Sequence, residues 1–473
     1  MIILNLNEFK IEVEKVVSKN SIIDDQDRIR KYSKDSHYPL IERNTPQMVI
    51  FPQNFQETQH IIRVANQFKI SIIPKSSEVS RYGGTIANND GIILNLQKLN
   101  RIITIDETNM HVVIEPGVTF KQLQMELDNY KLRILPTIFS SSDSIISSYL
   151  ARYPTYSMTK FEYTDLVVNL EIVLGNGEIF RTGSWASVKS PPVYPYGSSL
   201  DFFRIFHGAR GGLGVITKAS IRIKPIPLIQ EIVSVPFSNH NDFVKFVYDV
   251  ERKEIGTECI IMNKLNALNY LNIKEKPNDF PNWIFLICLE GPQRFPEEKI
   301  EYEKEALNLL IKQHSIKLKM NNLINQLEQK ILAEFNNPQD KKKKLYDLPI
   351  YLTLNKFPDI YSVIQNELSQ FNGNKIELGV SIIPVERNRT AYVEFDLYTE
   401  LNTEKEIIEF KKLFNNLGEL AVKAGAIIDI PYGPLKQVIY SKVGNYVALI
   451  QQVKDIFDPN NIMNPGKIEK EVI

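Results

Sequence analysis

The chain has 473 residues, of which 43% are hydrophobic and 24% are charged, as in an ordinary globular protein. This length is too great for one hydrophobic core, so we expect two or three domains. The 56 Lys and Arg residues balance the 56 Asp and Glu residues, which removes the overall positive charge typical of nucleic-acid-binding proteins and leaves a small molecule or another protein as the expected partner.

Helix-like and strand-like patterns alternate through the first 225 residues. The spacing of apolar residues predicts helices at 54–68 and 119–127 and strands at 70–73, 92–96, 111–114, 167–174, 178–181 and 215–223. A polar loop that contains Gly83 and Gly84 follows the first of these strands. Pro225 and Pro227 close the last strand, so we place a domain boundary there.

The pattern changes after residue 228. Strand-like stretches at 229–235, 283–289 and 391–397 alternate with long amphipathic helices near 297–335 and 403–424. This α+β pattern predicts a second domain. Lys341 to Lys344 form a charge run that we interpret as a solvated loop or, alternatively, as a docking patch for an acidic partner. A helix is predicted at 447–456, followed by two Pro-containing turns.

The two cysteines, Cys259 and Cys288, are too few for a disulfide framework, an iron–sulfur cluster or an all-cysteine zinc site. We predict that both are buried free thiols. Glu8 and Glu12 stand where a signal peptide would have a basic region and an apolar core. No apolar run reaches the ~18 residues of a membrane span, so the sequence predicts a cytoplasmic protein with no transmembrane segment.

Seven segments resemble segments of the FAD-linked oxidases of the vanillyl-alcohol oxidase/p-cresol methylhydroxylase superfamily, especially the glycolate oxidase and D-lactate dehydrogenase branch. They occur along this chain in the same order as in that family. They are Arg30-Lys31-Tyr32-Ser33-Lys34-Asp35, the strand, Pro74 and loop that end at Gly83-Gly84, Ile114-Glu115-Pro116-Gly117-Val118, Leu170-Glu171-Ile172-Val173-Leu174 with Gly177-Glu178, Gly212-Leu213-Gly214-Val215-Ile216-Thr217, Phe457-Asp458-Pro459, and Asn464-Pro465-Gly466-Lys467. No single segment is specific. Together they cover residues 30–225 and the C-terminal tail.

The resemblance implies an α+β fold in which a PCMH-type FAD-binding domain carries an α+β cap, or substrate, domain. It assigns residues 1–226 plus 436–473 to the FAD-binding domain and 227–435 to the cap. Some relatives attach FAD covalently through a His in the first loop, but residues 74–86 contain no His or Cys. We therefore expect FAD to bind without a covalent bond.

Loops rich in small residues suit a dinucleotide, because a pyrophosphate needs backbone N–H groups at close range. By resemblance, the cofactor-binding residues are Lys75, Ser76, Ser77, Glu78, Val79, Ser80, Gly83, Gly84, Ser141, Ser142, Ser147, Ser148, Val215, Ile216 and Asn464. The first loop departs from the usual Gly-rich pattern of the family. Glu78 would repel the pyrophosphate unless it turns outward or pairs with Arg81 or Lys75.

The glycolate oxidase branch carries a His-rich metal motif in the second domain, but residues 387–396 contain no His. The six histidines of the chain are scattered, so we expect no metal. On the strand predicted here, Tyr392 and Glu394 face one side, Glu394 as the candidate general base and Tyr392 as a proton donor. Arg387 and Arg389 are candidates to clamp a substrate carboxylate. Further candidates are Arg152, Tyr156 and Tyr163.

The expected reaction is hydride transfer from an alcohol, a 2-hydroxy acid or a similar carbon to the flavin N5 atom. The electrons would pass to a small acceptor or to a partner protein. The sequence also leaves open whether the chain forms a homo-oligomer. Two alternatives remain at this point. The chain could be a non-catalytic or flavin-depleted subunit of an oxidoreductase complex, or a flavoprotein that reduces a double bond with a nicotinamide donor.

Overall fold

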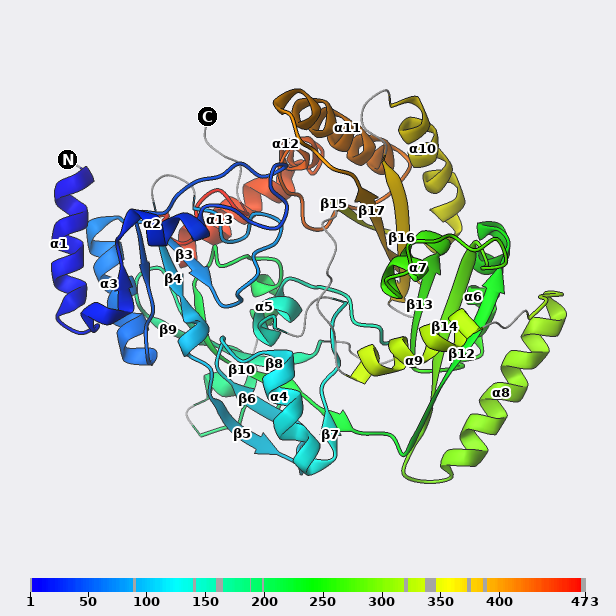
Figure 1. The fold of residues 1–473 in the computed structure, drawn as a ribbon. Helices are drawn as coiled ribbons and strands as arrows, with labels where there is room; N and C mark the ends of the chain where they lie inside the picture. Colours follow the sequence, from blue (N-terminus) through cyan, green and yellow to red (C-terminus); the bar gives the residue numbers. More distant parts are fainter. Residues whose placement is uncertain are drawn as a thin grey trace.

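The computed structural model describes residues 2–87, 91–138, 142–158, 165–187, 189–197, 200–318, 322–336, 346–371, 376–385 and 389–468. The strands form three main sheets. Figure 1 shows the first two sheets on one side of the molecule and the largest sheet on the other, with the short helix α5 (Ile145–Leu150) near the middle. No helix within these ranges is both long and apolar enough to cross a membrane.

The first sheet has four strands, of which the last three are parallel. In spatial order they are β1 (Ile22–Ile23), β2 (Met48–Ile50), β4 (Ile92–Asn95) and β3 (Ile72–Lys75). The helices of this region are α1 (Ile2–Glu14), α2 (Gln26–Ile29) and α3 (Phe55–Phe68). The helix predicted at 54–68 is confirmed as α3. Its N-terminus is stabilised by the Asn54 side chain, which accepts a hydrogen bond from the Glu57 N–H.

The second sheet is antiparallel and has five strands. In spatial order they are β5 (Ile102–Asp106), β6 (His111–Ile114), β10 (Val215–Arg222), β8 (Val167–Val173) and β9 (Ile179–Arg181). Helix α4 (Phe120–Leu127) begins after its cap Thr119, where the sequence predicts a helix. The prolines at 225 and 227 do not end the extended chain, because β11 (Lys224–Pro225) pairs with β7 (Leu132–Arg133).

The third sheet is antiparallel and has six strands. In spatial order they are β12 (Ile229–Phe237), β14 (Trp283–Gly291), β13 (Glu258–Asn263), β16 (Glu377–Val385), β17 (Thr390–Tyr398) and β15 (Tyr346–Leu352). The helices of this region are α6 (His240–Arg252), α7 (Lys264–Tyr270), α8 (Pro296–Gln313), α9 (Asn322–Asn336), α10 (Phe357–Gln370) and α11 (Glu404–Lys423). The helical region expected near 297–335 consists of two helices, α8 and α9.

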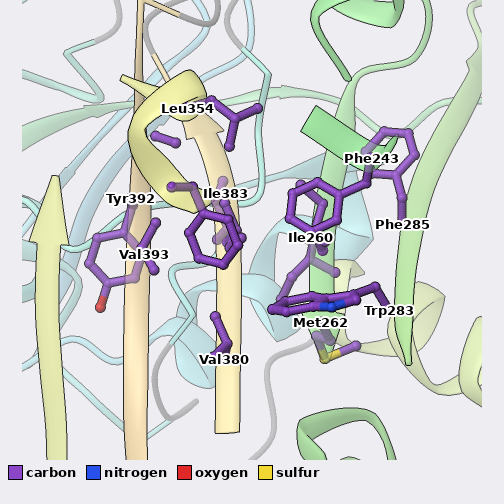
Figure 2. Close-up of a cluster of buried hydrophobic side chains, with 14 of the residues drawn as sticks. Phe243, Ile260, Met262, Trp283, Phe285, Leu354, Val380, Ile383, Tyr392 and Val393 are labelled. Carbon is purple, nitrogen blue, oxygen red and sulfur yellow. The ribbon is translucent and has the colours of Figure 1, made fainter. Parts of the chain in front are cut away.

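The two faces of the six-stranded sheet differ in chemistry. On one face the paired residues Leu348, Phe395 and Val380 are fully buried and apolar. Figure 2 shows part of the apolar core of this region, with Tyr392 at its edge and the Tyr392 hydroxyl directed away from the other labelled side chains. Glu394 pairs with Pro349 in β15, on the opposite face from Phe395. The polar face is therefore the one that can contribute to a site.

The chain returns to the first sheet at its C-terminal end, through α12 (Leu435–Tyr440) and α13 (Asn445–Phe457). The tail then lies beside β3, because the Ile72 N–H donates to the Ile462 carbonyl at 2.7 Å. Lys454 is fully buried, and its Nζ donates to the Gly212 carbonyl at 2.8 Å and pairs with Asp458 at 3.0 Å. This buried cation fixes the tail against the turn that enters β10.

Candidate functional site

Three loops that the sequence singles out converge on one cavity of about 1160 Å³. They are the loop after β3, the α5 segment and the turn before β10. The predicted cofactor-binding residues that line this cavity are Ser76, Ser77, Val79, Ser80, Gly84, Ser147, Ser148 and Ile216. We call this space the loop cavity.

The other predicted cofactor-binding residues do not line the loop cavity. They are Lys75, Glu78, Gly83, Ser142, Val215 and Asn464, while Ser141 lies outside the described residues. Glu78 is exposed, so it takes the outward orientation that a nearby pyrophosphate would require. Val215 is fully buried in its sheet. Lys75 Nζ donates to the Glu78 carbonyl at 2.8 Å, and burial lowers the pKa of Lys75 to about 8.

Asp35 and Asn464 hold the cavity loops in place from outside. The carboxylate of Asp35 accepts the backbone N–H of Gly83 at 2.6 Å and that of His37 at 2.7 Å. Gly83 has a φ of 69°, a conformation that favours glycine. The side-chain amide of Asn464 donates to the carbonyls of Gly84 at 2.9 Å and Arg210 at 2.6 Å. Both residues therefore shape the lining of the cavity.

Two arginines in the lining, Arg81 and Arg210, are not among the predicted cofactor-binding residues. Arg81 pairs with Asp143, whereas Arg210 donates to the Tyr82 carbonyl. No carboxylate within the described ranges forms an ion pair with Arg210, and burial lowers the pKa of its guanidinium. The Ser148 hydroxyl is also buried and has no hydrogen-bond partner there. A half-buried cation without an ion-pair partner and a free hydroxyl are what an anionic dinucleotide needs, so the residues fit FAD.

A smaller cavity of about 270 Å³ adjoins the loop cavity. Tyr82, Tyr153 and Ile430 line both spaces. Tyr392 from β17 and Tyr351 from β15 complete its aromatic walls. We call this space the tyrosine cavity. Its lining combines residues from the part of the chain that forms the first two sheets with residues of the six-stranded sheet.

A buried hydrogen-bond cluster fixes one wall of the tyrosine cavity. Both carboxylate oxygens of Asp347 accept hydrogen bonds, one from the Tyr82 hydroxyl and one from His37 Nε2 at 2.7 Å. The Tyr82 N–H lies 3.2 Å from His37 Nδ1. Burial lowers the pKa of His37, but the nearby carboxylates of Asp347 and Asp35 outweigh it and raise this pKa to about 9. Tyr432 donates to the Asp347 carbonyl. The cluster joins β15 to the first cavity loop.

The structure separates the predicted catalytic residues. The Tyr392 hydroxyl donates to Glu394 Oε2 at 2.6 Å, and Glu394 is fully buried and lines neither cavity. Burial and the nearby Glu394 hold the pKa of Tyr392 well above its ordinary value. Arg389 is exposed in the turn before β17 instead of on a strand, and Arg387 lies outside the described residues. Glu394 can therefore reach the tyrosine cavity only through Tyr392.

The remaining candidates from the first half of the chain also separate. Arg152 lines the tyrosine cavity. Tyr156 is buried, donates to Glu334 at 2.7 Å and lines neither cavity. Tyr163 lies outside the described residues. Of the two candidates among the described residues, Arg152 is the one that lines the tyrosine cavity.

One group of potential metal ligands lies elsewhere. Glu258, Cys288 and Glu290 each bring a ligand atom within 4.8 Å of the others. Arg133 and Lys224 already form ion pairs with both carboxylates, so this group is an ionic link between β7, β11 and the six-stranded sheet. Both cysteines are buried and free, as predicted.

Comparisons with known proteins agree with this geometry. A family model described as "FAD binding domain" matches residues 46–183, and one described as "FAD linked oxidases, C-terminal domain" matches residues 436–468. The glycolate oxidase subunit GlcD of Bacillus subtilis is 24% identical over 90% of this chain and 89% of its own length. The D-lactate dehydrogenase of Archaeoglobus fulgidus is 24% identical over 93% of this chain and 96% of its own. The structure of p-cresol methylhydroxylase with substrate bound is similar in fold, with a TM-score of 0.82 and 16% identity over 98% of this chain and 96% of that one.

The loop cavity and the two matched domains define a flavin-dependent oxidoreductase with FAD as its cofactor. The resemblance to FAD-linked oxidases that the sequence motifs suggest is confirmed, because residues 46–183 and 436–468 match the FAD-binding and C-terminal domains of such enzymes. The expected α+β fold with a PCMH-type FAD-binding domain is confirmed.

Proposed function

We propose that this enzyme oxidises the CH–OH group of a small alcohol or 2-hydroxy acid. FAD, when bound in the loop cavity, would accept the hydride from the substrate carbon at its N5 atom. The observation that carries the proposal is that the loop cavity and the tyrosine cavity share Tyr82, Tyr153 and Ile430. The names of the relatives, a glycolate oxidase and a D-lactate dehydrogenase, support the substrate class.

The proposal takes residues 1–226 with 436–473 as the FAD-binding domain and residues 227–435 as the cap. Residues of both parts line the tyrosine cavity, which suits a substrate held against the cofactor. The electrons would pass on to a small acceptor or to an acceptor protein. Because the described potential ligands outside the cavities are already ion-paired, we assign no metal to the reaction.

The proton of the substrate hydroxyl needs an acceptor, and two tyrosines of the tyrosine cavity each have a buried carboxylate behind them. Tyr82 has Asp347, but both oxygens of Asp347 are already bonded, one of them to His37. We therefore assign that pair a structural role. The Tyr392 hydroxyl would take the substrate proton while its own proton moves to Glu394, 2.6 Å away. Tyr392 stays protonated between turnovers because its pKa is raised.

Two substitutions test this assignment. Glu394→Gln and Tyr392→Phe should each retain FAD and lower turnover about 100-fold or more, because each interrupts the transfer of the proton. Glu334→Gln and Tyr156→Phe are matched controls, since this pair is also a buried tyrosine bonded to a glutamate, at 2.7 Å, and lines neither cavity. The measurement is anaerobic flavin bleaching with a panel of alcohols and 2-hydroxy acids. A Glu394→Gln enzyme with full turnover would refute the assignment.

A further inference from the structure

A third cavity, of about 1630 Å³, adjoins the tyrosine cavity. The two spaces share Arg152, Tyr153, Pro154, Tyr351 and Asp429. Tyr153 lines all three cavities. We call the third space the outer cavity. A molecule that enters from the outer cavity would meet the shared residues before it reaches the loop cavity.

Arg152 and Asp429 form an ion pair at this junction. Arg152 Nη2 lies 2.5 Å from Asp429 Oδ1. The guanidinium also lies directly on Gly208, where an added Cβ would be 2.7 Å from Nη2. Gly208 is part of the lining of the loop cavity. The positive charge of Arg152 is thus placed between the outer cavity and the cofactor side of the site.

The pair has the properties of an exchangeable contact. The Arg152 side chain is 43% exposed and that of Asp429 is 25% exposed, so water screens their attraction. A guanidinium presents several N–H donors and can bind a carboxylate through two of them. Asp429 thus occupies the position that a ligand carboxylate would take on Arg152.

We infer that Arg152 binds the carboxylate of a 2-hydroxy acid substrate and that Asp429 occupies Arg152 when no such substrate is bound. This inference rests on the proposed function, and it narrows the substrate class from alcohols in general to carboxylates. It gives Arg152 the clamping role that the sequence suggested for Arg387 and Arg389.

The exchange couples substrate binding to a proton. Burial raises the pKa of Asp429 and the nearby Arg152 opposes that rise. When a substrate carboxylate takes Arg152, Asp429 loses its stabilising partner and binds a proton from water. Besides Arg152, the other titratable groups that line these two cavities are Tyr82, Tyr149, Tyr153, Tyr351, Tyr392, Asp165, Arg204 and His207. Carboxylates should therefore bind more tightly as pH falls towards the pKa of Asp429.

Binding is measured by titrating the FAD-loaded enzyme with glyoxylate, pyruvate and phenylpyruvate, and following the shift in the flavin absorption spectrum. Methyl pyruvate serves as the uncharged counterpart. Arg152→Met should weaken binding of the acids about 10-fold or more and leave methyl pyruvate unchanged. Asp429→Asn should strengthen binding of the acids and remove its pH dependence, while Arg152→Lys should restore part of the affinity.

Arg181→Met is the matched control for Arg152→Met. Arg181 also has a side chain that is 43% exposed and pairs with a carboxylate, Glu171, at 2.7 Å, and it lines none of the three cavities. Equal binding of acids by wild type and Arg152→Met, or no binding of any of the three acids by wild type, would overturn the inference. Bleaching of the flavin by neutral alcohols in that case would leave the proposed oxidation intact. Arg152-dependent binding without bleaching by any substrate would instead overturn the proposed function alone.

Discussion

Arg210 offers a test in which cofactor affinity and protein stability change differently. Its guanidinium lines the loop cavity, is half-buried, and has no ion-pair partner within the described part of the chain. Partial desolvation lowers the pKa of this guanidinium, so without FAD the charge carries a cost that a counter-ion would remove. With FAD bound, the pyrophosphate would supply that counter-ion.

The magnitudes follow from these contacts. A hydrogen bond to a charged partner contributes about 1.5–3 kcal/mol, so Arg210→Met should raise the Kd for FAD by about 10- to 150-fold. In the apoprotein the substitution removes the partly desolvated charge and one hydrogen bond to the Tyr82 carbonyl. The bond contributes only about 1 kcal/mol. The free energy of unfolding of the apoprotein should therefore change little or rise.

Arg81 is the matched control, because it lines the same cavity but already pairs with Asp143. Arg81→Met leaves the buried Asp143 carboxylate without this partner and should destabilise the apoprotein by about 3 kcal/mol. Quenching of FAD fluorescence on titration with apoprotein gives the Kd, and urea unfolding of the apoprotein gives the stability. The reasoning is refuted if Arg210→Met binds FAD as tightly as wild type, or if it destabilises the apoprotein as much as Arg81→Met.

Three further outcomes are expected. Acid precipitation should release all flavin into the supernatant, because no His or Cys among the described residues lines the loop cavity; yellow colour in the pellet would contradict this. Prolonged chelation should leave turnover unchanged, and a loss that zinc or manganese restores would count against a metal-free reaction. The pKa of Lys75 is lowered to about 8 in the folded protein from an ordinary 10.5, so the unfolded chain binds more protons between these values and apoprotein stability should rise with pH across that window. Lys75→Met should remove this rise in urea unfolding curves.

The sequence predicts the turns and helix starts around the loop cavity well because their signals are local. Gly83 adopts a positive φ, and Thr119 and Asn54 cap their helices within three residues. These residue types carry the same information wherever the chain folds. In the six-stranded sheet, by contrast, strands such as β13 and β15 are short apolar runs whose neighbours come from distant parts of the chain. The spacing of apolar residues along the sequence cannot show which distant strands lie next to each other in the sheet.

The candidate site was harder to predict for the same reason. Tyr392 and Glu394 share a face, as strand geometry requires, but the structure shows that only Tyr392 lines the cavity. His37 and Asp347 are 310 positions apart in the sequence, yet they form one hydrogen bond. Arg210 precedes Gly211 and Gly212, which predict a turn. No neighbouring residue in the sequence indicates that the Arg210 side chain lines a cavity. Long-range contacts of this kind appear only when the chain is folded.

Two contacts made by residues that line the tyrosine cavity differ in their exposure to solvent. The link from Asp347 to Tyr82 and His37 is buried, with each of these residues less than 5% exposed. The link from Arg152 to Asp429 is partly exposed and adjoins the outer cavity. Buried hydrogen bonds to a charged group are costly to break, whereas a solvated ion pair exchanges readily. The first link can therefore hold β15 against the loop after β3 while the second changes partners, so a substrate can be admitted and bound without breaking the buried link.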